Sequence, residues 1–124
     1  GFGENKMSYD IYLRDPVSQE VLKLDDPHQM RGGTYQVGGT TEAWLNVTYN
    51  YAPHFYRVLG EEGIRTIYGM TGADSLPVLY GAIEQLADDP SMDYWEPTEG
   101  NAKASLYQLV ALAKLRPDGV WHGD

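Results

Sequence analysis

The hydrophobic period of this chain changes once along its length, and that change limits the folds it can adopt. Residues 7–14, MSYDIYLR, alternate apolar and polar side chains, whereas apolar residues in segments 76–86 and 102–113 recur every three or four positions. Alternation is typical of a half-buried strand, and the longer period is typical of an amphipathic helix. Strands followed by helices predict an α+β fold, with about three helices packed on one face of a small antiparallel sheet.

The sheet is predicted to begin with a hairpin. Residues 15–18, DPVS, form a turn sequence, because proline presets one backbone angle and aspartate bonds the following backbone. Residues 19–24 are then interpreted as a strand returning beside residues 7–14. The sequence DDP at 25–27 is expected to end that strand, because proline cannot donate to the ladder.

Further strands are predicted later in the chain. Alternation returns over residues 42–49, although a helix starting near Thr41 is an alternative. Two pairs of glycines flank residues 34–37 and favour tight turns around a short strand. Val120-Trp121 is expected either to add a short edge strand or to pack against the core.

The helices are predicted from their caps, prolines and glycines. Pro53 suits a helix first turn, and Gly60 suits a helix end. The next long helix is capped by Thr71 or Asp74, with Pro77 in its first turn. The predicted helical segments are residues 53–59, a single turn around 64–68, a helix reaching 86 and a last helix from 98 to 116.

The apolar stripes of these elements predict the core. The helix side should contain Leu79, Ile83, Leu106, Leu109 and Val110, packed against Ile11, Leu13, Leu22 and Val47.

Length and composition predict one small cytoplasmic domain. Met7-Ser8 has the form of a natural start, so we expect a single domain over residues 7–124, with residues 1–6 upstream or vector-derived. The chain has no cysteine, which excludes a disulfide framework, a thiolate zinc site and a cysteine nucleophile and is consistent with a reducing compartment. No apolar run approaches the roughly 18 residues that a membrane helix needs.

The net charge of −9 disfavours nucleic acids and anionic membranes as partners. Binding to phosphates requires clustered Lys and Arg, and the nine basic residues here are scattered along the chain. An acidic surface mainly promotes solubility. A sharper interpretation is an acidic mimic directed at a basic partner.

The stretch from Gly32 to Val58 contains the strongest candidate ligand site. Aromatic rings beside amide side chains suit sugars or bases, and a helix beginning at Pro53 presents free N–H groups to an anion. The alternative is that the stretch is scaffold, and Trp44→Ala separates the two, because a binding residue can be lost without unfolding. The candidate ligand-binding residues are Trp44, Asn46, Asn50, Tyr51, His54 and Arg57.

His54 is the best candidate for a catalytic acid or base, because only histidine titrates near neutrality unaided. Arg57, three residues on, would share its helix face and hold an anion. The alternative is that His54 packs or caps locally. No metalloprotease, nucleophile-elbow or phosphate-loop motif is present, so we expect no metal site and no cofactor.

The segment 88–100 carries five acids and two prolines and is predicted to be a loop. Its acids do not follow the order of a calcium-binding loop. Tyr94 and Trp95 lie within it and are candidate anchors for a protein partner, unless they fold back on the last helix.

Several strings resemble an uncharacterised family of small hypothetical proteins from gut-type bacteria, their phages and mobile elements. They are MSYDIYLRDP, GGTTEAWLNVTYNY, GIRTIYGMTG, YWEPTEGNA and RPDGVW, which together span nearly the whole chain from Met7. The resemblance implies no activity, cofactor or catalytic residue. The genomic setting that it implies favours a small accessory protein that binds something over a metabolic enzyme.

These observations favour a non-enzymatic, acidic, soluble binding protein that acts on a protein partner or a small polar ligand. The alternative is a small hydrolase that uses His54 with Arg57 in an aromatic-lined cleft. The two hypotheses differ in whether His54, Arg57, Asn46 and Tyr51 converge on one open pocket.

Overall fold

The computed structural model describes residues 8–32 and 38–124 and confirms the α+β class. The predicted strand at 34–37 and the expectation for residues 1–6 lie outside these ranges. The strands are β1 (Ser8–Arg14), β2 (Lys23–His28), β3 (Thr40–Glu42), β4 (Trp44–Thr48) and β5 (Val120–Gly123). The helices are α1 (Ala52–Leu59), α2 (Gly72–Glu84) and α3 (Glu99–Leu115), with short 3-10 helices η2 (Tyr49–Tyr51) and η3 (Gly63–Ile67).

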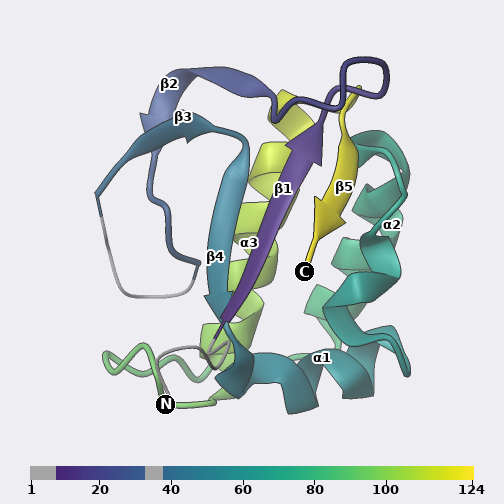
Figure 1. Ribbon diagram of the computed structural model, residues 1–124. Coiled ribbons are helices and arrows are strands. Elements are labelled where there is room, and N and C mark those ends of the chain that lie inside the picture. The colour runs from purple at the N-terminus through teal and green to yellow at the C-terminus, as the bar shows by residue number, and fades with distance from the viewer. Residues whose placement is uncertain (1–7, 33–37) are drawn as a thin grey trace, which may run out of the picture.

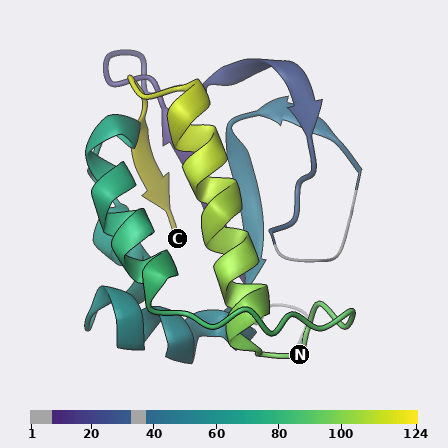
Figure 2. The same ribbon diagram turned by 180° about the vertical axis from the view of Figure 1, so that it is seen from behind.

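The main sheet has three antiparallel strands in the order β4-β1-β5. The chain ends beside the strand with which the described part begins, because β5 pairs with β1. Helix α3 runs behind the sheet, and α1 and α2 lie at its lower end and beside β5 (Figures 1 and 2). No described helix covers the other face, which we call the open face. Its side chains on the three strands are those of Ser8, Asp10, Tyr12, Arg14, Trp44, Asn46, Val120 and His122.

The hairpin after β1 is shorter than the sequence predicts. The turn at residues 15–18 forms as expected, with the Asp15 carboxylate accepting from two following backbone N–H groups. Beyond it, the chain returns beside the end of β1 through the bridge from Val21 to Arg14 and the bond from Leu22 N to Leu13 O, at 2.9 Å, and then leaves it. The reason is competition, because β4 occupies the same edge of β1 along most of its length.

Residues 25–27 continue a strand and do not end one. They belong to β2, which pairs with β3 in a separate two-stranded ribbon that projects beside β4 (Figure 1). The register of this ribbon shifts between Lys23 and His28. Pro27 is tolerated there, because both strands of such a ribbon are edge strands and an irregular register leaves ladder positions unused.

The helix ends follow the sequence signals with one exception. The Thr71 hydroxyl accepts from Asp74 N at 3.1 Å, so Thr71 and not Asp74 caps α2. This start places Pro77 in the interior of α2 and not in its first turn. In the interior, a proline has no N–H to donate to the carbonyl of residue 73. Gly60 ends α1 with a φ of 103°, a conformation that strongly favours glycine.

The predicted core is confirmed. All nine residues named from the apolar stripes belong to one buried cluster between the sheet and the helices. Trp121, Tyr51 and Phe55 add large side chains to this cluster that are fully shielded from solvent.

Replacing Leu109 by alanine tests the placement of α3. Leu109 has no exposed surface, so Leu109→Ala is expected to lower the free energy of unfolding by about 2–5 kcal/mol. Urea unfolding followed by circular dichroism measures the loss. A loss below about 1 kcal/mol would mean that this face of α3 is not packed in solution.

Candidate functional site

Three of the predicted ligand-binding residues attach η2 and α1 to residues 88–98, which we call the acidic loop. The Asn50 side chain donates to the carbonyl of Trp95 at 2.7 Å, and His54 Nε2 contacts the carbonyl of Pro97 at 2.7 Å. Arg57 lies 3.4 Å from the Glu99 carboxylate, just beyond the loop. These contacts run from α1 and η2 to a segment more than forty residues later, so they fix where the loop lies.

The partners of His54 define its tautomer. A carbonyl oxygen only accepts, so Nε2 must carry the proton that points at Pro97. A guanidinium only donates, so Nδ1, which is 3.2 Å from the Arg57 guanidinium, is the acceptor. Both ring nitrogens therefore contact groups of the chain itself, as expected for a histidine that positions a loop.

Tyr51 and Tyr94 are buried partners and are not exposed surface groups. The Tyr51 hydroxyl donates to the carbonyl of Tyr94, and the Tyr94 hydroxyl accepts from Thr48 N at 2.7 Å. Their rings meet edge to face with centroids 5.7 Å apart. Tyr94 is thus packed against the end of β4. Because Tyr94 is buried, only Trp95 of this pair, which is 46% exposed, is accessible to a partner.

Trp44 and Asn46 lie elsewhere, on the open face. Strand alternation directs Leu45 and Val47 into the core and leaves Trp44 and Asn46 half-buried on the other side. The cavities that Trp44 lines include none of Asn50, Tyr51, His54 and Arg57. The six candidate residues therefore form two groups and do not share one cleft.

The first cavity beside Trp44, the acidic hollow, has a volume of about 330 Å³. It is lined by Asp10, Tyr12, Val21, Glu42 and Trp44. Tyr12 and Trp44 are direct partners across β1 and β4, so their side chains leave neighbouring positions on the same face of the sheet. The Asn46 amide donates to the Asp10 carboxylate at 3.0 Å and orients it.

The second cavity, the Arg31 hollow, lies on the other side of Trp44 and has a volume of about 310 Å³. It is lined by Ser8, Met30, Arg31, Trp44 and Asn46. Backbone bonds from Asn46 N to Met30 O and from Gly32 N to Asn46 O, both 2.7 Å, hold this segment along the outer edge of β4. The Arg31 guanidinium stacks over the Trp95 ring at 5.1 Å, which links the open face to the acidic loop.

The charges around the open face are unevenly distributed. Two carboxylates line the acidic hollow, and a guanidinium lines the Arg31 hollow. Burial and the nearby Arg14 guanidinium lower the pKa of His122, which favours the neutral form of this ring on the open face. Trp44 therefore separates a negatively charged hollow from a positively charged one.

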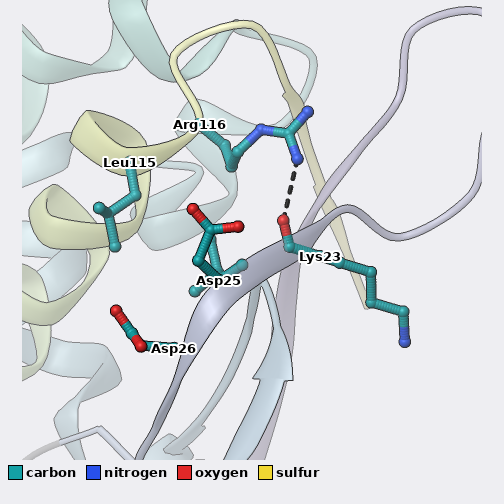
Figure 3. Close-up of a pocket in the computed structure, with 6 residues that line it drawn as sticks. Lys23, Asp25, Asp26, Leu115 and Arg116 are labelled. Carbon is teal, nitrogen blue, oxygen red and sulfur yellow. Dashed lines mark hydrogen bonds between the residues drawn. The ribbon is translucent and has the colours of Figure 1, made fainter.

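Another cavity lies between β2 and the end of α3 and has a volume of about 260 Å³ (Figure 3). Asp25 and Asp26 face Leu115 and Arg116 across it. The Arg116 guanidinium donates from Nη1 to the carbonyl of Lys23 at 2.9 Å, and its Nε and Nη2 donate to the two carboxylate oxygens of Asp118 at 3.1 and 2.9 Å. This cavity is where the ribbon is fastened to α3.

Two acids of the acidic loop, and Glu99 at the start of α3, accept hydrogen bonds from backbone N–H groups of their own chain. Asp89 accepts from Gly100 N at 2.9 Å, Asp93 from Trp95 N at 3.1 Å and Glu99 from Ala87 N at 2.9 Å. Within residues 8–32 and 38–124, no cluster of three or more His, Asp or Glu side chains is arranged to hold a metal ion.

The buried tyrosines give a testable pH dependence. Burial raises the pKa of Tyr9 to about 12 and also raises the pKa of Tyr51, Tyr68 and Tyr94. Tyrosine in the unfolded chain ionises near pH 10. The contribution of these buried, protonated tyrosines to folding stability is therefore complete below about pH 10, and it is lost as the pH rises through their raised pKa values in the folded state. Above pH 10, ionisation of the last tyrosines, seen as tyrosinate absorbance, should coincide with loss of the near-ultraviolet circular dichroism signal. Ionisation of every tyrosine without loss of the dichroism signal would contradict the burial.

Comparison with known proteins adds no assignment: no family model, no curated protein and no solved structure matches this chain. In the described part of the chain, no helix combines the length and apolar character needed to cross a membrane.

Sequence reasoning missed most of the residues that surround Trp44. Asp10 and Tyr12 were assigned only to the polar side of their strand, and Glu42 and Arg31 were not singled out. The residue types could have indicated a site, because two acids, Asp10 and Glu42, beside two aromatic rings are chemically distinctive. Their proximity depends on the β1–β4 register and on the segment beside β4, which the sequence does not define.

Proposed function

We propose that this protein is a non-enzymatic, cytoplasmic binding protein that recognises a protein partner through the open face of its sheet. The observation that supports the proposal is the position of Trp44, half-buried between the acidic hollow and the Arg31 hollow. A tryptophan flanked by hollows is a common anchor of protein interfaces, because it offers a large apolar area at low entropic cost.

The shape of the open face favours a protein over a small ligand. All five side chains that line the acidic hollow are half-buried, and so are all five that line the Arg31 hollow. Small-molecule sites usually enclose most of the ligand surface. Two open hollows beside one ring instead suit a protein partner, because the partner's own surface can enclose them.

Trp95 extends this surface. It is partly exposed, and the Arg31 guanidinium lies between its ring and the open face. A partner seated on Trp44 can therefore reach Trp95 across Arg31, which unites the two regions that the sequence analysis treated separately.

Within residues 8–32 and 38–124, the contacts of His54 and Arg57 do not favour the hydrolase alternative. His54 and Arg57 do touch each other, but their remaining contacts are with Pro97 and Glu99 of the chain. The resemblance to proteins of gut-type bacteria, phages and mobile elements supports an accessory role in such a genomic setting.

Native mass spectrometry of the protein isolated from cell extract tests the proposal. The wild type is expected to retain a protein partner, and Trp44→Ala is expected to weaken that interaction by about thirtyfold, as truncation of a hot-spot residue does. The thermal unfolding midpoint of the variant should change little, because Trp44 is only half-buried.

Two variants serve as controls. Tyr80→Ala removes an exposed aromatic side chain, 38% accessible, from α2, and Arg57→Ala removes the guanidinium required by the hydrolase alternative. Both should retain the partner. Retention that survives Trp44→Ala, or that is lost in Arg57→Ala alone, would contradict binding through the open face.

A further inference from the structure

The acidic hollow has a lining suited to an organic cation. Two carboxylates, from Asp10 and Glu42, stand beside two aromatic rings, from Tyr12 and Trp44, with Val21 as the remaining wall. Aromatic faces attract cations through their quadrupole, and carboxylates add Coulomb attraction and hydrogen-bond acceptors. The five lining side chains include no basic group.

The neighbouring cations are engaged at the margins of the hollow. Lys23 lies 3.4 Å from the Glu42 carboxylate, and its side chain is 68% exposed while that of Glu42 is 46% exposed, so this pair is weak and replaceable. The Arg14 guanidinium sits 5.5 Å from the centre of the Tyr12 ring and donates to Gln19 at 3.0 Å. Arg14 does not line the hollow, whose walls include the Trp44 ring, the Glu42 carboxylate and the Asp10 carboxylate that the Asn46 amide orients.

The chain already uses the same chemistry on itself. Arg31 stacks over the rings of Tyr94 and Trp95, each at 5.1 Å, and Arg65 lies 5.2 Å from the centre of the Tyr9 ring. Contacts between a cation and an aromatic ring are therefore compatible with the surface of this fold at several places.

We propose that the acidic hollow binds a lysine or arginine side chain of a basic protein partner, with the Trp44 ring against the cation and the carboxylates of Asp10 and Glu42 around it. This inference rests on the proposed function, because it assigns the chemistry of the partner at that same surface. The net charge of −9 is complementary to a basic partner and favours its approach.

The opposite charge of the Arg31 hollow sets the orientation. A basic side chain in the acidic hollow places the next part of the partner over Trp44 and towards Arg31. An acidic side chain or a backbone carbonyl of the partner suits that second position, because a guanidinium only donates.

Calorimetric titration with synthetic peptides tests the inference. The probes are a short lysine-containing peptide, the same peptide with its lysines acetylated, and the same peptide with its lysines trimethylated. Acetylation removes the charge and should abolish binding, whereas trimethylation keeps the charge and should preserve or strengthen binding to an aromatic wall. Indole N–H chemical shifts should identify Trp44 as the tryptophan that the lysine peptide perturbs.

Matched variants separate the site from general charge attraction. Trp44→Leu and the double variant Asp10→Asn with Glu42→Gln are each expected to weaken binding of the lysine peptide by about tenfold. The double variant Glu61→Gln with Glu84→Gln removes the same charge from exposed positions after α1 and at the end of α2 and should change the affinity less than about twofold. Thermal melts verify that each variant is folded.

Three outcomes would overturn the inference. Equal weakening by both double variants would mean that only the overall charge matters. Equal occupancy of the hollow by free butylammonium would identify a small cation, and not a protein side chain, as its occupant. Failure of the wild type to bind any of these peptides would reject the basic side chain, while Trp44-dependent retention of a natural partner would still support the proposed function.

Discussion

Replacing Trp121 by alanine is expected to lower the free energy of unfolding by about 3–5 kcal/mol. Trp121 is the largest fully buried side chain, and its indole N–H donates to the buried hydroxyl of Ser75 at 2.8 Å. Its removal leaves a cavity between β5 and α2 and takes a donor away from that hydroxyl. Because small domains are stable by only about 5–15 kcal/mol, urea unfolding should show a large shift in the midpoint.

Two further variants give this result its meaning. Trp95→Ala makes the same chemical change at a residue that is 46% exposed, and it should cost much less. Ser75→Ala removes the acceptor of the indole hydrogen bond and the bond that the same hydroxyl donates to the Gly72 carbonyl at 2.8 Å, with an expected loss of about 1–2 kcal/mol. Equal losses for Trp121→Ala and Trp95→Ala would mean that β5 is not packed against the core.

The role of β5 marks the boundary of what the sequence could predict. Local patterns identified β4, α2 and α3, because alternation, capping residues and apolar stripes act within a few residues of each other. The pairing of β5 with β1 joins residues more than one hundred positions apart. The sequence at 120–121 therefore allowed either an edge strand or simple packing, and only the three-dimensional arrangement decides for the strand.

The hairpin after β1 shows the same limit of sequence-based prediction, because its turn is local but the length of its strands is not. The turn at residues 15–18 has a strong local signal and forms as predicted. How far the two strands stay together depends on what else competes for the edge of β1, and β4 occupies most of it. Pro27 then falls in the β2–β3 ribbon, where an edge position tolerates it.

The candidate site divides in a similar way. Alternation correctly placed Trp44 and Asn46 on the side of β4 away from the core. It could not place Tyr12 and Asp10 beside them, because alternation defines the face of each side chain but not which strands pair, and a shift of two residues in register would keep the faces and change the neighbours. The predicted companions Asn50, His54 and Arg57 are near Trp44 in the sequence, but η2 and α1 carry them to the acidic loop.

Asn101 is a residue of the acidic-loop region whose importance no sequence pattern indicated. Its side chain is fully buried at the start of α3, and both the oxygen and the nitrogen of its amide form hydrogen bonds. The oxygen accepts from Ser91 N at 2.9 Å, and the nitrogen donates to the carbonyls of Asp93 and Glu96, each at 3.0 Å. One side chain therefore fixes the backbone on both sides of Tyr94 and Trp95.

Asn101→Asp is expected to lower the free energy of unfolding by about 3–5 kcal/mol at neutral pH. The substitution keeps the shape but replaces a donor by a carboxylate oxygen, which then faces two carbonyl oxygens without solvent. Both the burial and those carbonyls raise the folded pKa of the introduced carboxyl. Its penalty relative to the wild type should therefore shrink as pH falls towards the unfolded value of about 4, where the carboxyl is protonated in both states.

Asn50→Asp is the matched control for this prediction. Asn50 makes the same type of bond, from its amide nitrogen to the carbonyl of Trp95 at 2.7 Å, but its side chain is exposed to solvent. Water can solvate the new carboxylate there, so the expected loss is below about 1 kcal/mol and nearly independent of pH in this range. Urea unfolding of both variants at neutral and acidic pH measures the difference. Equal losses, or a loss for Asn101→Asp that does not shrink on acidification, would mean that the loop is not held to α3 by a buried amide.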